Sequence, residues 1–168
     1  SQGGSRSPIE RDTPIIIDYL MSLSGYHSDS TRMAVSGTMP DGAVEIYEKT
    51  RELLRFCEDT IREGSTPSKI YEEMVALAHD KGIGDNFMGP GELAVKFTGH
   101  SVGLEVNELP VLAPRFDEPL VAGNTLAIEP KYTHPEWGVI GVENTYAVRA
   151  DRLENLTEIS EDIISVAG

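Results

Sequence analysis

The order of the hydrophobic patterns restricts the fold of this 168-residue chain more than any other feature. A β-branched run at 14–19 enters through a proline and predicts a buried strand, and an extended run at about 26–35 predicts its hairpin partner. Two amphipathic helices are predicted over about 43–63 and about 66–81. Beyond Gly82, short extended runs alternate with glycine, proline and aspartate, which is typical of strands joined by turns.

Strands, two helices and further strands in this order predict an α+β fold. We expect a curved antiparallel sheet covered by helices on one side. The later strands are expected in the runs LAVKF, VGLEV, NTLAIEP and GVIGVENTYAV, and the tail segments RLENLT and DIISV are expected to add a closing strand and a terminal segment. With 39% apolar residues, residues 1–168 are long enough to form a single domain around a hydrophobic core.

The predicted hairpin begins almost at residue 14, after only a polar lead-in. A curved sheet that starts there would be left with an exposed edge or face, so the fold would be incomplete at its N-terminal end. We therefore expect the chain either to be a fragment of a longer protein or to rely on a partner chain, such as a second copy in a homodimer.

The formal net charge of −14 argues against nucleic acid as a partner, because the phosphate backbone would be repelled. The same charge disfavours an anionic membrane surface, and no apolar run approaches the roughly 20 residues of a membrane span. The single cysteine, Cys57, excludes an intrachain disulfide and suits a reducing compartment. We therefore expect a cytoplasmic protein without nucleic-acid or membrane partners.

Five candidate metal ligands follow one another along the chain: Asp18, Asp29, His100, Glu129 and Glu143. Four carboxylates and one imidazole form an oxygen-rich set, enough to hold two divalent cations with a water between them. Such a water loses a proton at neutral pH, and a neighbouring Glu can hold that proton and pass it to a leaving amine. Without cations, carboxylates this close would repel one another and raise their pKa values. Spacing alone is a weak signal, because the chain has 28 acidic residues and four histidines.

The sequences around these residues carry more information than their spacing. GYHSDSTR, GHSVGLEVNELP, LAIEP and GVENTYAV resemble, in the right order, the metal-binding segments of the pita-bread metallopeptidases. This family includes methionine aminopeptidase, Xaa-Pro aminopeptidase, prolidase and creatinase. The resemblance runs from about Pro14 to the C-terminus and is closest to the Xaa-Pro peptidase branch. It implies a duplicated α/β half-fold with a dinuclear site for Mn or Co, with Zn or Fe as alternatives.

The resemblance also implies a role for each ligand. Asp18 would chelate one metal, and Asp29 and Glu143 would bridge both. His100 and Glu129 would bind the other metal, and Glu129 would also be the catalytic proton shuttle.

This chain departs from the family pattern near the same motifs. Asn107 replaces a second His that helps to bind substrate, so Asn107 is the candidate substrate-binding residue; it can donate a hydrogen bond but cannot carry a proton. Gly141 replaces a frequent Arg, and Ser101 replaces a usual Gly. The family's first helices, and a substrate-contacting His before the first Asp, are absent from this sequence. Lys131 directly follows the Glu-Pro pair, where it either offsets the carboxylates or lies in solvent.

The resemblance implies a hydrolase that cleaves a short peptide near its N-terminus, with proline after the scissile bond. Two alternatives stay open. The same fold also hosts other reactions, such as creatinase-like C–N hydrolysis or a lyase reaction, because a fold does not determine a function. The fold also serves as a non-catalytic peptide- or histone-binding module, although retention of all five ligands counts against that reading.

Overall fold

The computed structural model describes residue 6 and residues 8–166, and its elements follow the predicted order. A hairpin of β1 (Ile15–Leu23) and β2 (Tyr26–Ser36) precedes helices α1 (Asp41–Thr60) and α2 (Pro67–Asp80). Two short 3₁₀ turns follow, η1 (Gly84–Asn86) and η2 (Gly91–Leu93). The remaining strands are β3 (Gly99–Ser101), β4 (Glu108–Val111), β5 (Thr125–Ile128), β6 (Lys131–His134), β7 (Gly138–Gly141), β8 (Asn144–Val148), β9 (Leu153–Asn155) and β10 (Ile164–Val166).

The two helices lie where the apolar spacing predicts them. Thr66 precedes α2 and Pro67 is its first residue, a position where the missing N–H of proline costs nothing. Helix α1 ends at Thr60, a few residues earlier than predicted, because Ile61 is already extended. Gly64 adopts a positive φ of 86° in the turn beyond the helix rather than at its end.

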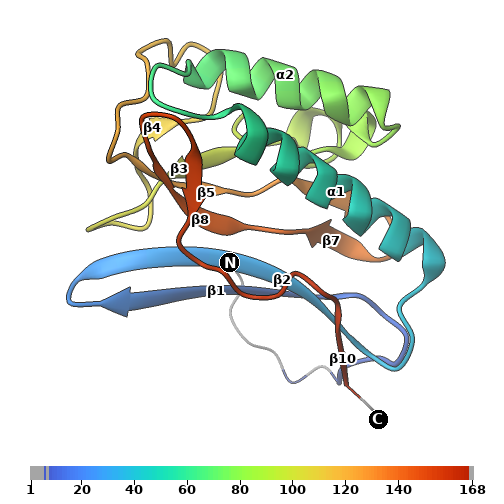
Figure 1. The fold of residues 1–168 in the computed structure, drawn as a ribbon. Helices are drawn as coiled ribbons and strands as arrows, with labels where there is room; N and C mark the ends of the chain where they lie inside the picture. The colour runs from blue at the N-terminus through green and yellow to red at the C-terminus, as the bar shows by residue number, and fades with distance from the viewer. Residues whose placement is uncertain (1–5, 7, 167–168) are drawn as a thin grey trace.

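The elements form three layers, with the helices above a middle layer of short strands and the β1–β2 hairpin below it (Figure 1). The middle layer contains a five-stranded sheet in the order β4-β3-β5-β8-β9 and the separate pair β6-β7. Helix α1 contacts β6, β7 and β9, whereas β2 contacts β5, β7 and β8. The core fills the space between these layers, and its residues Leu53, Cys57, Met74, Leu126 and Ile140 are fully buried.

A backbone bridge joins the hairpin sheet to the middle layer. Thr31 of β2 and Glu143, which lies between β7 and β8, exchange two N–H···O bonds, each with an N···O distance of 3.2 Å. Glu143 was predicted inside a strand, and the structure places it at this isolated bridge instead. The bridge thus brings a residue of the second half of the chain against the hairpin, 112 residues away in sequence.

Three details of the strand predictions are wrong. Strand β1 is not buried: it is an edge strand, and within the predicted run Ile17 is 38% exposed and Asp18 is exposed as well. The run LAVKF forms no strand, because glycines and a proline at 89–91 turn the chain into η2 and leave Leu93 exposed. The run VGLEV forms a bend rather than a strand. The terminal segment DIISV instead supplies β10, which pairs in parallel with β2, while the other strand pairings are antiparallel.

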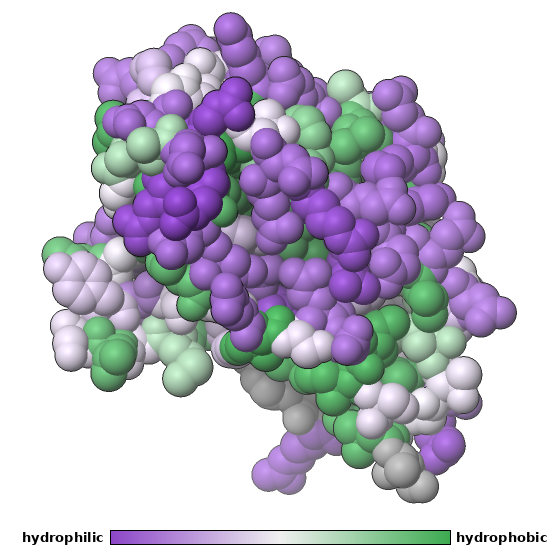
Figure 2. All heavy atoms as spheres, in the orientation of Figure 1, coloured by the Kyte–Doolittle hydropathy of each residue, from purple (hydrophilic) through white to green (hydrophobic). Residues whose placement is uncertain are grey.

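The hairpin sheet leaves apolar side chains exposed to solvent. Figure 2 shows apolar atoms gathered on the lower part of the molecule, over the hairpin and β10. The exposed apolar residues of this sheet are Ile17, Leu20, Met21, Leu23, Tyr26, Ile164 and Val166. In the part of the chain that the structure describes, no helix is long and apolar enough to cross a membrane.

Candidate metal centre

The five predicted ligands lie together where the hairpin meets the middle layer. Asp18 and Asp29 come from β1 and β2, and His100 from β3. Glu129 directly follows β5, where Pro130 ends the pairing, and Glu143 lies at the bridge to Thr31. One ligand atom from each of Asp29, His100 and Glu143 lies within 4.8 Å of the others, and all three residues are buried. The role of the five residues as metal ligands stays a prediction; these three lie close enough to hold one cation together.

The hairpin register explains how the two aspartates share one face. Asp18 pairs directly with Thr31, and Thr31 is two residues from Asp29, so the three side chains point to the same side of the sheet. The Thr31 hydroxyl donates to Glu143 Oε2 at 2.7 Å, which fixes that carboxylate against the hairpin. Asp18 is the most open of the set, with 48% of its side chain exposed, and lies at the rim.

The imidazole of His100 is oriented by the backbone of the next residue, Ser101. Its Nδ1 donates to the carbonyl oxygen of Ser101 at 3.1 Å, which directs Nε2 toward the carboxylates. Nε2 lies 3.4 Å from Glu129 Oε1. Burial by itself lowers the pKa of His100, but the hydrogen bond with Glu129 and the one to Ser101 outweigh it, so the pKa is raised.

The carboxylates divide into two electrostatic groups. Burial raises the pKa of Asp29, and the charge of Asp18 adds to that effect. Burial also raises the pKa of Glu143, to about 7, against the opposing charge of Lys131. Burial would raise the pKa of Glu129 as well, but His100 and Lys131 outweigh it and lower that pKa. Burial and neighbouring negative charge therefore raise the pKa values of Asp29 and Glu143, whereas the positive neighbours of Glu129 lower its pKa.

Lys131 enters the carboxylate cluster, which settles the alternative that the sequence left open. Its Nζ lies 2.6 Å from Glu129 Oε2, 3.2 Å from Glu143 Oε2 and 3.4 Å from Asp18 Oδ2. Only 16% of the Lys131 side chain is exposed. Burial would lower the pKa of Lys131, but Glu129 and Glu143 outweigh that effect and raise it. The side chain therefore enters the site as an ammonium rather than lying in solvent.

The donor set fits a divalent cation at the His100 side of the cluster. Asp29 Oδ1 and Glu143 Oε1 are buried and have no hydrogen-bond partner among the described residues. Buried charged oxygens without partners are costly, so native structures rarely leave them so unless something else satisfies them. Carboxylate oxygens of Asp29 and Glu143 beside the His100 imidazole are the ligand types that divalent transition metals accept.

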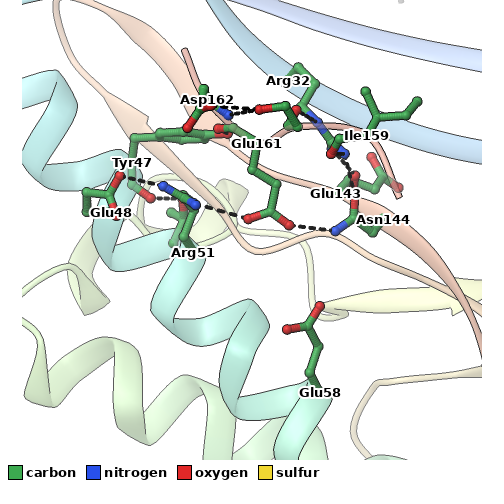
Figure 3. Close-up of polar contacts among 12 residues, drawn as sticks. Arg32, Tyr47, Glu48, Arg51, Glu58, Glu143, Asn144, Ile159, Glu161 and Asp162 are labelled. Atoms are coloured by element: carbon green, nitrogen blue, oxygen red, sulfur yellow. Dashed lines mark hydrogen bonds and ion pairs between the residues drawn. The ribbon is translucent and has the colours of Figure 1, made fainter. Parts of the chain in front are cut away.

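A buried guanidinium holds the backbone on which Glu143 lies, and the sequence did not predict this role. Arg32, 2% exposed, donates to the carbonyl oxygens of Thr31 and Glu143 at 2.8 and 2.7 Å and to Asn144 Oδ1 at 2.7 Å (Figure 3). It also donates to Ile159 and Ser160 carbonyls, which attach the tail. Arg32 is the last residue of the motif GYHSDSTR and is followed by three apolar residues of the same strand, 33–35. A charged residue next to such a run is the sequence feature that could have indicated its buried role.

The network continues from Asn144 toward helix α1. Asn144 Nδ2 donates to Glu161 Oε1 at 2.8 Å, and Glu161 in turn accepts from Arg51 at 3.1 Å. The hydroxyl of Tyr146 donates to Glu58 of α1 at 2.7 Å. Figure 3 shows the carboxylate of Glu161 between Arg51 and Asn144, with a dashed line to each. The residue after Glu143 is therefore held by α1 and by the tail together.

Asn107 lies apart from this cluster in a different setting. It is exposed, in the bend that precedes β4. The neighbouring His27, in β2, is half-buried and its Nδ1 donates to the carbonyl oxygen of Gly103 at 3.2 Å, which ties this bend to the hairpin. The role of Asn107 as a substrate-binding residue stays a prediction.

The class of this protein follows from comparison with known families. Residues 2–150 match the metallopeptidase family M24, and the chain belongs to that family. The predicted pita-bread fold and the resemblance to Xaa-Pro peptidases are confirmed.

Individual relatives agree with the family assignment. The chain is 27% identical to an Xaa-Pro dipeptidase of Lactobacillus delbrueckii subsp. lactis over 96% of its own length and 42% of that protein. The X-Pro aminopeptidase of Thermotoga maritima MSB8 superposes with a TM-score of 0.86 at 25% identity, over 94% of this chain and 43% of that one. The N-terminal domain of the FACT complex subunit SPT16 from Eremothecium gossypii shares the fold, with a TM-score of 0.82 at 18% identity over 99% of this chain and 39% of that one. The chain thus spans less than half the length of the curated relatives it matches.

Replacing Arg32 tests whether the guanidinium supports the site. We expect Arg32→Leu to lower the free energy of unfolding by about 3–5 kcal/mol, because it leaves buried carbonyl oxygens and Asn144 without a donor. Arg149→Leu is the control: its side chain is 45% exposed, so the change should stay within about 0.5 kcal/mol. Equal effects of the two substitutions, measured by urea unfolding, would contradict the assignment.

The raised pKa of Glu143 predicts how the metal-free protein responds to pH. The folded state binds the Glu143 proton more tightly than the unfolded chain, so this contribution to stability is present below about pH 4.5 and is lost as the pH rises to about 7. We expect the melting temperature of the chelator-treated protein to fall across this range, and to fall less in Glu143→Gln. Glu72→Gln, an exposed residue of α2, is the control and should follow the wild type. A parallel fall in Glu143→Gln would show that another group titrates.

Proposed function

We propose that this chain is the metal-binding, catalytic part of an Xaa-Pro peptidase that hydrolyses short peptides with proline after the scissile bond. The observation that carries the proposal is the cluster of Asp29, His100 and Glu143, in which two buried carboxylate oxygens lack a partner among the described residues. The names of the relatives, Xaa-Pro dipeptidases, support the choice of substrate. The five ligands have the capacity for two divalent cations, and their oxygen-rich character favours Mn or Co over Zn or Fe.

Within this proposal, each side chain has a task that its surroundings suit. A bound divalent cation would supply Lewis-acid polarisation of the peptide carbonyl and acidify water at neutral pH. Glu129 would accept the proton of the attacking water and deliver it to the leaving amine, because its lowered pKa keeps it ionised at neutral pH. His100 would hold its orientation through the bond to Ser101. Asn107 would donate a hydrogen bond to the peptide from the exposed bend before β4.

A non-catalytic peptide-binding module is the second candidate. Asn107 and Gly141 stand where the family pattern has His and Arg, so two groups that would assist peptide hydrolysis are replaced. The fold shared with the SPT16 N-terminal domain is compatible with this role, although at 18% identity it speaks for the fold alone. The two candidates make opposite predictions for cleavage in the presence of metal.

The remaining expectations about cellular context are also proposals. A short peptide is the proposed ligand, and the net charge of −14 opposes nucleic acid and anionic membranes. The exposed apolar face of the hairpin sheet is consistent with a further segment or a second copy of the chain covering it. The buried single cysteine suits the cytoplasm.

Cleavage of Xaa-Pro dipeptides tests the proposed function directly. We expect proline release in the presence of added Mn²⁺ or Co²⁺, and a decrease in kcat/KM of about 10²- to 10⁴-fold in Glu129→Gln, because Gln cannot accept the proton. Glu136→Gln, in the exposed loop between β6 and β7, should retain wild-type activity. Peptide binding without cleavage would favour the binding module, and undiminished activity of Glu129→Gln would contradict the mechanism.

A further inference from the structure

We propose that the ammonium of Lys131 occupies the position of the second cation, so that the chain binds one divalent cation, at Asp29, His100 and Glu143, and accepts another only by displacing Lys131. The inference rests on the metal centre of the proposed function and concerns the number of cations it takes. It revises the dinuclear site that the family resemblance implies.

The cluster divides into two parts around Glu143. Glu143 Oε2 accepts from Thr31 at 2.7 Å and lies 3.2 Å from Lys131 Nζ, whereas Glu143 Oε1 has no partner among the described residues. Glu143 is grouped with Asp29 and His100, and Asp29 also has a buried oxygen, Oδ1, without a partner among the described residues. The Glu143 carboxylate therefore has one oxygen bonded to Thr31 and Lys131 and one oxygen without a partner among the described residues, which leaves that oxygen for a cation.

Lys131 neutralises and hydrogen-bonds the carboxylates in the part of the cluster that contains Asp18. Its Nζ bonds Glu129 Oε2 at 2.6 Å and reaches Asp18 Oδ2 at 3.4 Å, in addition to Glu143. An ammonium has three donors, and here three carboxylates from different segments surround it. A divalent cation in this part would need the same oxygens, so the ammonium and the cation compete for one position.

The fold holds Lys131 in this position. Lys131 begins β6 and pairs with Gly141 of β7, and a Cβ on Gly141 would come within 2.6 Å of Lys131 Cγ. The missing side chain at 141 thus provides the space through which the lysine passes.

The charge of the cluster favours one bound divalent cation over two. Four carboxylates are offset by one ammonium, so one divalent cation nearly neutralises the cluster. A second one beside Lys131 would place three cationic centres around the two oxygens of Glu143, whose side chain is 1% exposed and poorly screened by solvent. Removing the ammonium would instead leave carboxylates that a second cation can satisfy.

Metal stoichiometry tests this inference. Bound metal is measured by elemental analysis after equilibrium dialysis against Mn²⁺. We expect about one bound ion per wild-type chain and about two per Lys131→Met chain, because the variant leaves the carboxylates that contact Lys131 free to bind a second cation. Lys131→Gln keeps polar contacts without the charge and should also bind about two ions, which covers a failure of the Met variant to fold. Lys69→Met removes an exposed lysine of α2 and should bind about one.

The outcomes separate this inference from the proposed function. No bound ion in the wild type would remove the metal centre itself, and with it the proposed function. Two ions in the wild type would leave the metal centre standing and overturn the role of Lys131. One ion in the wild type and one in both Lys131 variants would overturn it as well. The expected result is an increase of about one ion per chain on loss of the ammonium alone.

Discussion

Repulsion among four carboxylates gathered at the junction of two sheets is the constraint on which the rest of the structure depends. Asp18 and Asp29 come from the hairpin, and Glu129 and Glu143 come from the middle layer, so the two layers approach each other through like charges. Positive groups make this approach tenable: Lys131 lies within the cluster, and Arg32 lies behind it. One oxygen each of Asp29 and Glu143 has no partner among the described residues, so these positive groups do not satisfy the whole cluster. A cation there would complete the joining of the layers, so metal binding would stabilise the folded protein.

The rigid surroundings of Glu143 show why the site is precise. Its backbone is bridged to Thr31, its carbonyl accepts from Arg32, and the next residue is held by Glu161 of the tail. Helix α1 joins this network through Tyr146 and Glu58. These buried hydrogen bonds restrict the position of the Glu143 backbone and tie the C-terminal tail to the site.

The sequence predicted the parts of this molecule that local physics controls. The helices follow from apolar spacing and from Pro67, and Asp18 and Asp29 share a face because a hairpin register has a period of two. The burial of β1 was predicted wrongly, because a β-branched run looks the same whether its sheet is covered or not. The Thr31–Glu143 bridge and the path of Lys131 over Gly141 depend on contacts between distant segments, which no local pattern encodes. The family resemblance supplied the ligand set and the expectation of two metals, and we propose that Lys131 takes the place of one of them.

Anomalous diffraction from crystals grown with Mn²⁺ tests the central claim most directly. The account predicts one anomalous peak between Asp29, His100 and Glu143, with Lys131 Nζ still bonded to Glu129. Two peaks, with Lys131 turned away from the carboxylates, would contradict it.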